Sequence, residues 1–360
     1  MKILIFGTGK IANDVMNNLN LSRMEIQIIG FIDNDNSKYA HLFFGRKIYS
    51  VVDAVKLNYD YICILVGDKY QEIYNQLTTE CEVESRKIID RLAFLKLLMV
   101  EKYKKDDRSF VDDTLEYWKK HPISFMNQFQ YTKETYENVF WDKENDMPYI
   151  MLGDKRLYYP QDYSDFIEEE GQTKVVSYRA VEQHPASPHR YLKDYICIQE
   201  GDVVVDAGAR EGDFALPYIE SIRKLYLFEC DLKWVRALQM TYKDYLDKVV
   251  IIPKMLTDYE SEETTTLDAI LKEEKINFLK MDIEGAEVKA LEAARKTLDT
   301  KNIRCSICSY HRTKDEEVIF YLLKEAGFEC ALSEGYVVFI DDPHIFRDLD
   351  FRKAIVYAHK

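Results

Sequence analysis

The sequence predicts an α/β protein with two doubly wound domains, each a mainly parallel sheet covered by helices. Near both ends of the chain, short apolar runs end in glycine-containing turns and lead into helical patterns. Runs that are apolar throughout are typical of parallel strands buried on both faces. The middle of the chain lacks this alternation and is rich in aromatic residues. It therefore predicts an α+β connector between the two domains.

The first domain is expected over residues 1–95. The apolar run that begins at Lys2 leads through a Gly-x-Gly turn into a helix that continues to Leu19. Further apolar runs at Ile28–Ile32 and Tyr61–Val66 follow, and a candidate helix lies between them. This βαβ alternation predicts a small Rossmann-like domain.

The connector is expected over residues 96–190. A helical pattern at Val111–Lys120 should end at Pro122, because proline cannot continue the hydrogen-bond ladder of a helix. The runs Pro148–Leu152 and Arg156–Pro160 flank a Gly-Asp pair and predict a β-hairpin.

The third region, residues 191–360, predicts a complete doubly wound domain of Rossmann-like type with seven strands. Helical patterns separate most of its apolar runs, and the last two runs are close enough to form a hairpin. The runs are Val203–Val205, Leu225–Phe228, Val249–Ile252, Phe278–Met281, Ile303–Ile307, Val337–Ile340 and Ala354–Tyr357.

Composition limits the classes of function. The chain has 360 residues and a formal net charge of −14, which repels phosphate backbones and argues against a nucleic-acid partner. Its seven cysteines show no disulfide spacing, and no apolar stretch reaches the length of a membrane span. We therefore expect a cytoplasmic protein. Neither the acceptor nor the oligomeric state follows from composition, and a homodimer is compatible with it.

The clearest motif begins at Val203, where a predicted strand ends at Asp206 and the glycines Gly208 and Gly212 follow. Glycines let a loop turn tightly and approach a ligand, and a helix after Gly212 would direct its N-terminus at the bound group. Twenty-three residues after Asp206, the next strand ends in Glu229, where a carboxylate suits the hydroxyls of a ribose. The pattern predicts a site for an adenosine-containing cofactor.

A second group of charges follows the predicted strand Phe278–Met281. Lys280, Asp282, Glu284 and Glu287 are crowded where ligands bind in open α/β sheets, at the carboxyl ends of strands. Such like charges need a cation or Lys280 to compensate them. We assign Glu287 to the first turn of the following helix, and Asp282 and Glu284 to function.

These motifs, together with TTTLDAIL, the DIEGAE element and the Tyr310-His311 pair, closely resemble FkbM-type methyltransferases that depend on S-adenosylmethionine. The resemblance extends from about Tyr191 to the C-terminus and implies a class I methyltransferase fold. It implies methyl transfer to a hydroxyl, often on a sugar, and from it we expect a role in bacterial surface polysaccharide biosynthesis. By position, the cofactor residues would be Asp206, Gly208, Ala209, Gly212, Phe214 and Glu229, with Asp258 near the adenine.

The chemistry requires an aligned acceptor oxygen and a proton acceptor. We favour His311 as the base, and its alternative is a strand-end histidine bonded to the backbone. Asp282 or Glu284 would instead orient the acceptor hydroxyl or hold a divalent metal ion that lowers its pKa, and Asp282 is the metal ligand that we favour. Lys280 would lie beside them. Cys305 and Cys308 do not predict a zinc site with His311, because strand residues three positions apart point to opposite faces and no fourth ligand is evident.

In the first domain, Gly7 and Gly9 with Asp33 about 20 residues later fit a dinucleotide-binding pattern. The segments Phe31–Asp35 and Val66–Tyr70 resemble small Rossmann-like domains of bacterial polysaccharide-biosynthesis enzymes, which bind NAD or a nucleotide-sugar. The alternatives for the whole chain are an NAD-dependent nucleotide-sugar oxidoreductase or epimerase and a non-catalytic cofactor-binding scaffold. The first of these lacks a visible Tyr-x-x-x-Lys pair.

Overall fold

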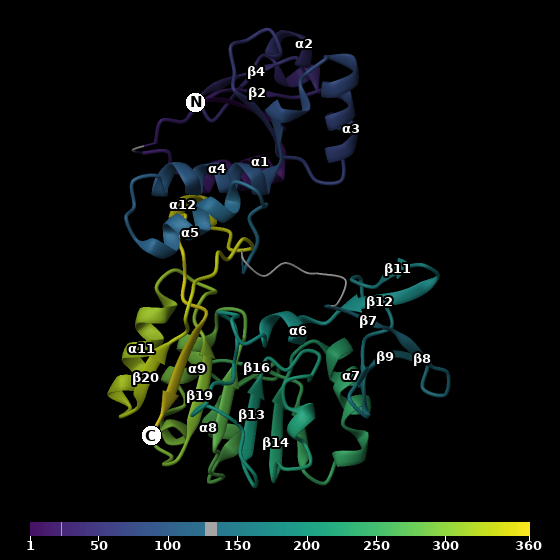
Figure 1. Cartoon of the computed structure of the whole chain (residues 1–360), viewed down its shortest axis with the longest axis vertical. Coiled ribbons are helices and arrows are strands. Elements are labelled where there is room, and N and C mark those ends of the chain that lie inside the picture. Colours follow the sequence, from purple (N-terminus) through teal and green to yellow (C-terminus); the bar gives the residue numbers. More distant parts are fainter. Residues whose placement is uncertain (23, 127–134) are drawn as a thin grey trace. The chain divides into compact units, whose positions relative to one another are not determined.

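The chain forms two compact units in a computed structural model that describes residues 1–22, 24–126 and 135–360 (Figure 1). One unit combines Met1–Gln128 with Val338–Phe351, and the other combines Phe129–Val337 with Arg352–Lys360. The predicted α/β class is confirmed. The expected connector is not a third unit in this division, because residues 96–190 are shared between the two.

The N-terminal unit is a doubly wound sheet with strand order β3-β4-β2-β1-β5-β6. All neighbours pair in parallel except β3 and β4. Its strands are β1 Lys2–Phe6, β2 Gln27–Ile32, β3 Leu42–Phe43, β4 Arg46–Tyr49, β5 Tyr61–Ile64 and β6 Ile88–Ile89. Its α-helices are α1 Lys10–Asn18, α2 Val51–Ala54, α3 Tyr70–Asn75, α4 Arg91–Tyr103, α5 Ser109–Trp118 and α12 Ile345–Asp348, with short turns η1 Asn36–Lys38, η2 Gln76–Glu80 and η3 Ser85–Lys87.

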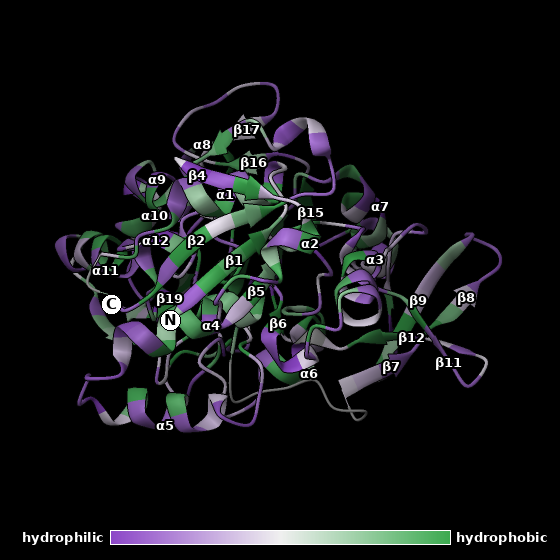
Figure 2. Cartoon of the chain, turned by 90° about the horizontal axis from the view of Figure 1, so that it is seen from above, coloured by the Kyte–Doolittle hydropathy of each residue, from purple (hydrophilic) through white to green (hydrophobic). Residues whose placement is uncertain are grey.

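Alternating side chains of β1 supply two separate cores, one on each face of this sheet. Ile3 and Ile5 belong to a cluster with α1, α4 and α5, whereas Leu4 and Phe6 belong to a cluster with α2 and α3. Figure 2 shows β1 coloured as hydrophobic over most of its length, whereas α5 alternates between hydrophilic and hydrophobic residues. Both faces of the strand are buried, which explains its continuous apolar run.

The C-terminal unit contains a seven-stranded sheet with order β15-β14-β13-β18-β19-β21-β20. Only β21 runs antiparallel to its neighbours, β19 and β20. The strands are β13 Val203–Ala207, β14 Lys224–Phe228, β15 Val249–Ile252, β18 Phe278–Met281, β19 Arg304–Cys308, β20 Glu329–Leu332 and β21 Ile355–His359. The helices are α6 Tyr178–Glu182, α7 Leu232–Thr241, α8 Leu267–Leu271, α9 Glu287–Glu292, α10 Arg295–Leu298 and α11 Asp315–Glu325, with 3₁₀ turns η5 Leu216–Tyr218 and η6 Lys243–Tyr245.

Three small sheets complete this unit. The predicted hairpin is confirmed as β9 with β10, and β8 extends it. The strands of these sheets are β7 Tyr136–Asn138, β8 Phe140–Asp142, β9 Met147–Leu152, β10 Lys155–Tyr158, β11 Ile167–Glu169, β12 Gln172–Val176, β16 Met255–Leu256 and β17 Thr264–Thr265.

Two predicted elements of the C-terminal unit are wrong. The run Val337–Ile340 is not a strand: Val337 makes one isolated bridge to Arg352, and Val338 lies in the apolar core of the N-terminal unit. The seventh strand is instead β20. The expected helix after Gly212 is only the 3₁₀ turn η5.

Among the described residues, no helix combines the length and the apolar character that crossing a membrane requires.

Candidate functional site

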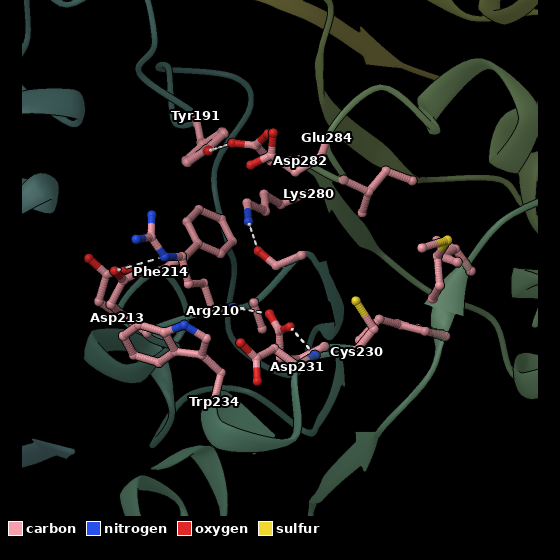
Figure 3. A pocket seen from close by; sticks show the side chains of 18 of the residues that line it. Tyr191, Arg210, Asp213, Phe214, Cys230, Asp231, Trp234, Lys280, Asp282 and Glu284 are labelled. Carbon is pink, nitrogen blue, oxygen red and sulfur yellow. Dashed lines mark hydrogen bonds and ion pairs between the residues drawn. The ribbon is translucent and has the colours of Figure 1, made fainter. Parts of the chain in front are cut away.

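A cavity of about 470 Å³ opens at the carboxyl ends of β13, β14 and β18 (Figure 3). Ligands of open α/β sheets bind at this edge. Its lining combines carboxylates, aromatic rings and glycine-rich backbone: Glu182, Tyr191, Gly208, Ala209, Arg210, Glu211, Asp213, Phe214, Phe228, Glu229, Cys230, Asp231, Trp234, Lys254, Met255, Leu256, Lys280, Asp282, Ile283, Glu284 and Tyr310.

The loop after β13 requires glycine at Gly208. This residue has φ +75°, and a Cβ atom there would lie 1.7 Å from the carbonyl oxygen of Asp282. Gly212 has φ +76°, and its Cβ would lie 2.5 Å from a methyl of Leu238. Both positions have a left-handed backbone that favours glycine, and at Gly208 the close approach to a backbone carbonyl excludes any side chain. The sequence singled out both glycines correctly as loop-forming residues.

Asp206 and Lys280 form a buried ion pair beneath this loop. Lys280 Nζ lies 2.9 Å from Asp206 Oδ1 and donates a 2.7 Å hydrogen bond to the carbonyl of Gly208. Burial alone lowers the pKa of Lys280, but the adjacent carboxylates Asp206 and Asp282 raise it, so the ammonium remains charged. Asp206 is fully buried and is absent from the cavity lining. The geometry assigns it to holding the loop.

Glu229 follows β14 and lines the cavity with its carboxylate held in place. Its Oε2 accepts a 2.9 Å hydrogen bond from the backbone N–H of Arg210, and its Oε1 accepts a 2.8 Å bond from that of Asp231. These two donors fix the orientation of the carboxylate at the tip of the strand. The sequence predicted an acid that binds ribose at this position.

The wall beside Glu229 is both acidic and aromatic. Burial raises the pKa of Glu211 to about 8 and that of Asp213 to about 6. The guanidinium carbon of Arg210 lies 5.6 Å from the centroid of the Trp234 ring, and Figure 3 shows these two side chains next to each other. Phe214 also lines the cavity, as predicted for a cofactor residue. The wall therefore suits a ligand that carries positive charge and a flat ring.

Asp258 is not brought into this wall. It is exposed and absent from the lining, while Met255 and Leu256, a few residues earlier, do line the cavity. The structure thus offers no support for Asp258 at an adenine.

Asp282 lies on the opposite side of the cavity and is surrounded by donors. Its Oδ2 accepts a 2.6 Å hydrogen bond from the Tyr191 hydroxyl, which Figure 3 shows facing it, and its Oδ1 a 3.4 Å bond from Tyr310. Burial alone raises the pKa of Asp282, but the charges of His311 and His189 outweigh it and hold the pKa well below its usual range. Asp282 is therefore an anion that faces the cavity.

His311, the predicted base, lies behind Asp282 and is absent from the cavity lining. Its Nδ1 is 3.0 Å from Glu287 Oε1 and its Nε2 is 3.3 Å from Asp282 Oδ1. Burial lowers the pKa of His311, but the hydrogen bond to Glu287 and the surrounding carboxylates raise it to about 9. A protonated imidazole cannot accept a proton, so this arrangement does not support His311 as a general base at neutral pH.

Glu287 has a larger role than the helix charge that the sequence predicted. It does stand in the first turn of α9, but its side chain is fully buried. Besides the pair with His311, its Oε1 accepts a 2.8 Å hydrogen bond from the backbone N–H of Ile283. Glu284, by contrast, is an exposed rim residue with φ +56°, and its Oε2 lies 3.5 Å from His311 Nε2.

His189 lies in the loop after α6, and no motif in the sequence marks it as a site residue. It is 1% exposed, with Nδ1 3.5 Å from Glu182 Oε2 and Nε2 3.6 Å from Asp282 Oδ2. The Cys308 Sγ atom lies 3.6 Å from the same Nε2. Cys305, three residues before Cys308, belongs to an apolar cluster that does not include Cys308, which agrees with the expectation that the two cysteines point apart.

The Gly7–Gly9 loop of the N-terminal unit differs from the loop after β13, because the carboxylate beside it is paired with a lysine. Gly7 has φ +112°, and a Cβ there would lie 2.8 Å from the carbonyl oxygen of Leu65. The Asp33 carboxylate accepts hydrogen bonds from Thr8 and from Lys38, whose Nζ lies 2.9 Å away. Gly9 is open, with no atom near its Cβ position. The acid expected to bind a ribose is therefore already engaged by a lysine.

The comparisons with known proteins divide the chain in two. Residues 161–330 match the model of the methyltransferase FkbM domain, and residues 1–89 match that of the N-terminal domain of C2185-like proteins. The expected similarity of the N-terminal domain to polysaccharide-biosynthesis enzymes is not shown. None of the curated proteins matches the chain.

Among solved structures, a methyltransferase FkbM from Methylobacillus flagellatus KT is 14% identical, with 99% of this chain and 90% of that chain covered and a TM-score of 0.43. SMU.1697c, a putative methyltransferase from Streptococcus mutans in complex with SAH, is 15% identical over 46% of this chain and 93% of that one, with a TM-score of 0.32. An rRNA methylase from Streptococcus thermophilus is 20% identical over 46% and 92%, with a TM-score of 0.33.

The family match falls on the unit that contains the seven-stranded sheet and the cavity. It confirms the resemblance that the DIEGAE element and the loop after β13 suggested. Residues 161–330, within the C-terminal unit, are therefore similar to the methyltransferase FkbM domain.

Proposed function

We propose that the C-terminal unit is an S-adenosylmethionine-dependent O-methyltransferase that acts on a hydroxyl of a sugar or glycan in bacterial surface polysaccharide biosynthesis. The observation that carries this proposal is the Glu229 carboxylate, fixed by two backbone N–H groups at the edge of the cavity opposite Asp282. A carboxylate in this place suits the paired hydroxyls of a ribose.

The cavity fits the cofactor in size and charge. A volume of about 470 Å³ lies in the range of ligand pockets. Glu211 and Asp213 offer negative charge for the sulfonium and ammonium groups, and the Trp234 and Phe214 rings offer flat apolar surface. Gly208 and Gly212 keep the loop free of side chains where the cofactor would lie.

The residues of the protein align the acceptor hydroxyl, and they do not need to activate the methyl group. The sulfonium of the bound cofactor supplies an already activated methyl group. Asp282 stays ionised beside the cavity and can accept the hydrogen bond of an acceptor hydroxyl, which orients the oxygen for in-line attack. As the oxygen–methyl bond forms and the sulfur–methyl bond breaks, the same carboxylate would take the proton that the hydroxyl loses. His311 and Glu287 hold Asp282 in place from behind. We accordingly place His311 as a positioning residue, and Lys280 with Asp206 as supports of the loop.

Exposed aromatic side chains before residue 161, where the family match begins, would provide a surface for the acceptor. Phe140 and Trp141 are 44% and 49% exposed, unlike Tyr159 and Tyr163, whose rings pack at 5.7 and 5.3 Å from Trp234. Exposed rings stack on the apolar faces of sugars. We therefore propose the first pair for acceptor contacts and the second for support of the cofactor wall.

The test is methyl transfer to a glycan. Mass spectrometry of the cell-surface glycan with and without the gene should show loss of one CH₂ increment of about 14 Da per methylated site. Purified protein with S-adenosylmethionine should restore the increment on glycan from the deletion strain, and the Asp282→Asn variant should restore it at least 100-fold more slowly. A glycan mass that does not change on deletion would contradict the proposed acceptor.

A nucleotide-sugar or NAD in the N-terminal unit would have to displace Lys38 from Asp33. We propose that this unit binds such a ligand only weakly, through the loop that contains Gly7 and Gly9. Calorimetric titration with NAD and with a uridine diphosphate sugar tests this, and Lys38→Ala should strengthen ribose binding by freeing Asp33. Submicromolar NAD affinity in the unaltered protein would favour the oxidoreductase alternative instead.

A further inference from the structure

Three side chains from three separate segments meet beside Asp282 as potential metal ligands. They are His189, from the loop after α6, Asp282, directly after β18, and Cys308, at the end of β19. We propose that these three residues bind one divalent transition-metal ion of the zinc class. Binding of the ion is independent of the proposed methyl transfer, whereas a role of the ion toward an acceptor rests on it.

The distances between the three ligand atoms suit one ion. His189 Nε2 lies 3.6 Å from Asp282 Oδ2 and 3.6 Å from Cys308 Sγ, and all three atoms lie within 4.8 Å of one another. A tetrahedral ion with bonds of about 2.1 Å to nitrogen and oxygen and about 2.3 Å to sulfur holds its ligand atoms roughly 3.4–3.7 Å apart. Two of the three spacings therefore match one ion, and the third, between Asp282 and Cys308 Sγ, is at most 4.8 Å.

The Glu182 carboxylate lies beside the second ring nitrogen of His189, where it can support a metal-bound histidine. Glu182 Oε2 lies 3.5 Å from His189 Nδ1, on the far side of the ring from Cys308. Histidines that bind metals usually give their second N–H to a carboxylate or carbonyl, which fixes the ring and leaves the other nitrogen for the ion. The Glu182–His189 pair has this arrangement.

The donor set indicates the class of ion and the type of site. A thiol with an imidazole and a carboxylate favours zinc or a similar ion over Mg²⁺, which prefers oxygen ligands. His189 and Cys308 are buried, and Asp282 lines the cavity together with Tyr191. Three protein ligands with one position open to a cavity are typical of catalytic rather than structural zinc. An acceptor oxygen could occupy that open position.

The neighbouring group of Asp282, Glu287 and His311 suits an ion less well. His311 Nδ1 lies 3.0 Å from Glu287 Oε1, a hydrogen-bond distance that is shorter than the spacing of two ligand atoms on one tetrahedral ion, and Nε2 lies 3.3 Å from Asp282 Oδ1. The imidazole thus separates the two acids and links them as an ion-paired chain. The Lys280 ammonium is held by Asp206 and by the Gly208 carbonyl, so its positive charge is balanced before an ion enters.

The experiment uses the full chain, freed of metal with a chelator and titrated with Co²⁺. We expect a near-ultraviolet thiolate-to-cobalt charge-transfer band that saturates at one equivalent and disappears when Zn²⁺ is added. Cys308→Ser should abolish the band, and His189→Gln should weaken Co²⁺ binding at least 100-fold. Cys305→Ser is the matched control, because Cys305 is a buried cysteine of the same strand, and it should leave the band unchanged.

Absence of the band in the unaltered protein would overturn the inference, as would a band that survives Cys308→Ser. If Cys308→Ser does not fold, Glu182→Gln replaces it, with an expected 10- to 100-fold loss of Co²⁺ affinity. Unchanged affinity in that variant would count against the site. Calorimetry with S-adenosylmethionine, run in parallel, separates the two proposals: cofactor binding without Co²⁺ binding overturns this inference alone, and Co²⁺ binding without cofactor binding overturns the proposed function alone.

Discussion

Asp282 shows how much of the site rests on contacts between residues far apart in the chain. Its partners Tyr191, His189 and His311 come from segments 91, 93 and 29 residues away. The sequence could identify Asp282, because the DIEGAE element places it at the end of a predicted strand. It could not identify Tyr191 or His189 as partners, because nothing in the pattern of their own loop encodes the position of β18.

Gly208 allows a test at the scale of one residue. Gly208→Ala should destabilise the C-terminal unit well beyond the roughly 1–2 kcal/mol cost of a left-handed alanine, because its Cβ would lie 1.7 Å from the Asp282 carbonyl. Gly201→Ala is the control, since Gly201 has φ +80° and open space around its Cβ position. Urea unfolding measures the free energy of unfolding of both variants. Equal losses of stability would show that the close approach at Gly208 is absent.

The acidic wall predicts a pH dependence of cofactor binding. Burial raises the carboxyl pKa of Glu211 to about 8 and of Asp213 to about 6, so both hold protons for part of the time near neutral pH. A sulfonium favours the ionised carboxylates, so binding releases protons, and affinity should rise from pH 6 to pH 8, by at most tenfold per pH unit for each proton. Calorimetry across this range measures it.

S-adenosylhomocysteine is the matched control ligand, because it has the same amino group but a neutral sulfur. Its affinity should depend less on pH, and Glu211→Gln should flatten the upper part of the profile for S-adenosylmethionine. Identical profiles for the two ligands would contradict a direct role of the acidic wall.

At the scale of elements, the buried strands were predictable and the irregular ones were not. β13, β14 and β18 are mainly apolar because both faces are covered, whereas β15, at the edge of the sheet, has an exposed residue, Val250. β20, Glu329–Leu332, is only partly buried, so its sequence carries little of that pattern. The apolar run Val337–Ile340 misled the prediction, because Val338 is buried in the core of the N-terminal unit rather than in this sheet.

β19 is anchored by a buried ion pair whose loss should be costly. Arg304 Nη2 lies 2.8 and 2.9 Å from the two carboxylate oxygens of Asp202, and its Nη1 donates to the Cys197 carbonyl. Asp202→Ala leaves the guanidinium buried without its carboxylate and should cost about 3–5 kcal/mol of unfolding free energy. Glu274→Ala removes the partly exposed pairs of Glu274 with Arg223 and Lys224 and should cost less than about 1 kcal/mol per pair. Urea denaturation compares the two, and similar losses would contradict the account.

At the scale of the whole molecule, the fold class and both glycine loops could be predicted, but the division into units could not. The segment Val338–Phe351 leaves the C-terminal sheet after β20 and joins the N-terminal unit before β21 begins. The predicted connector is likewise shared, since α4 and α5 pack in the N-terminal core. Such exchange depends on which apolar surfaces meet in three dimensions, and no local pattern records it.

This division predicts that a residue near the C-terminus stabilises the N-terminal unit. Phe346 is 1% exposed, and its ring centroid lies 5.9 Å from that of Phe94 in α4. Phe346→Ala should cost about 3–5 kcal/mol and speed amide hydrogen exchange in β1 and α1 while β13 and β18 stay protected. Faster exchange confined to the C-terminal sheet would show that the segment belongs to the other unit.

The central claim is that the cavity beside β13 and β14 binds S-adenosylmethionine. Isothermal titration calorimetry of the full chain tests it most directly, with Glu229→Ala to remove the carboxylate at the cavity and Asp258→Ala as the exposed control. The account predicts one binding site per chain, at least a 100-fold loss of affinity in Glu229→Ala and unchanged affinity in Asp258→Ala. No binding by the unaltered protein, or full affinity in a folded Glu229→Ala variant, would contradict it.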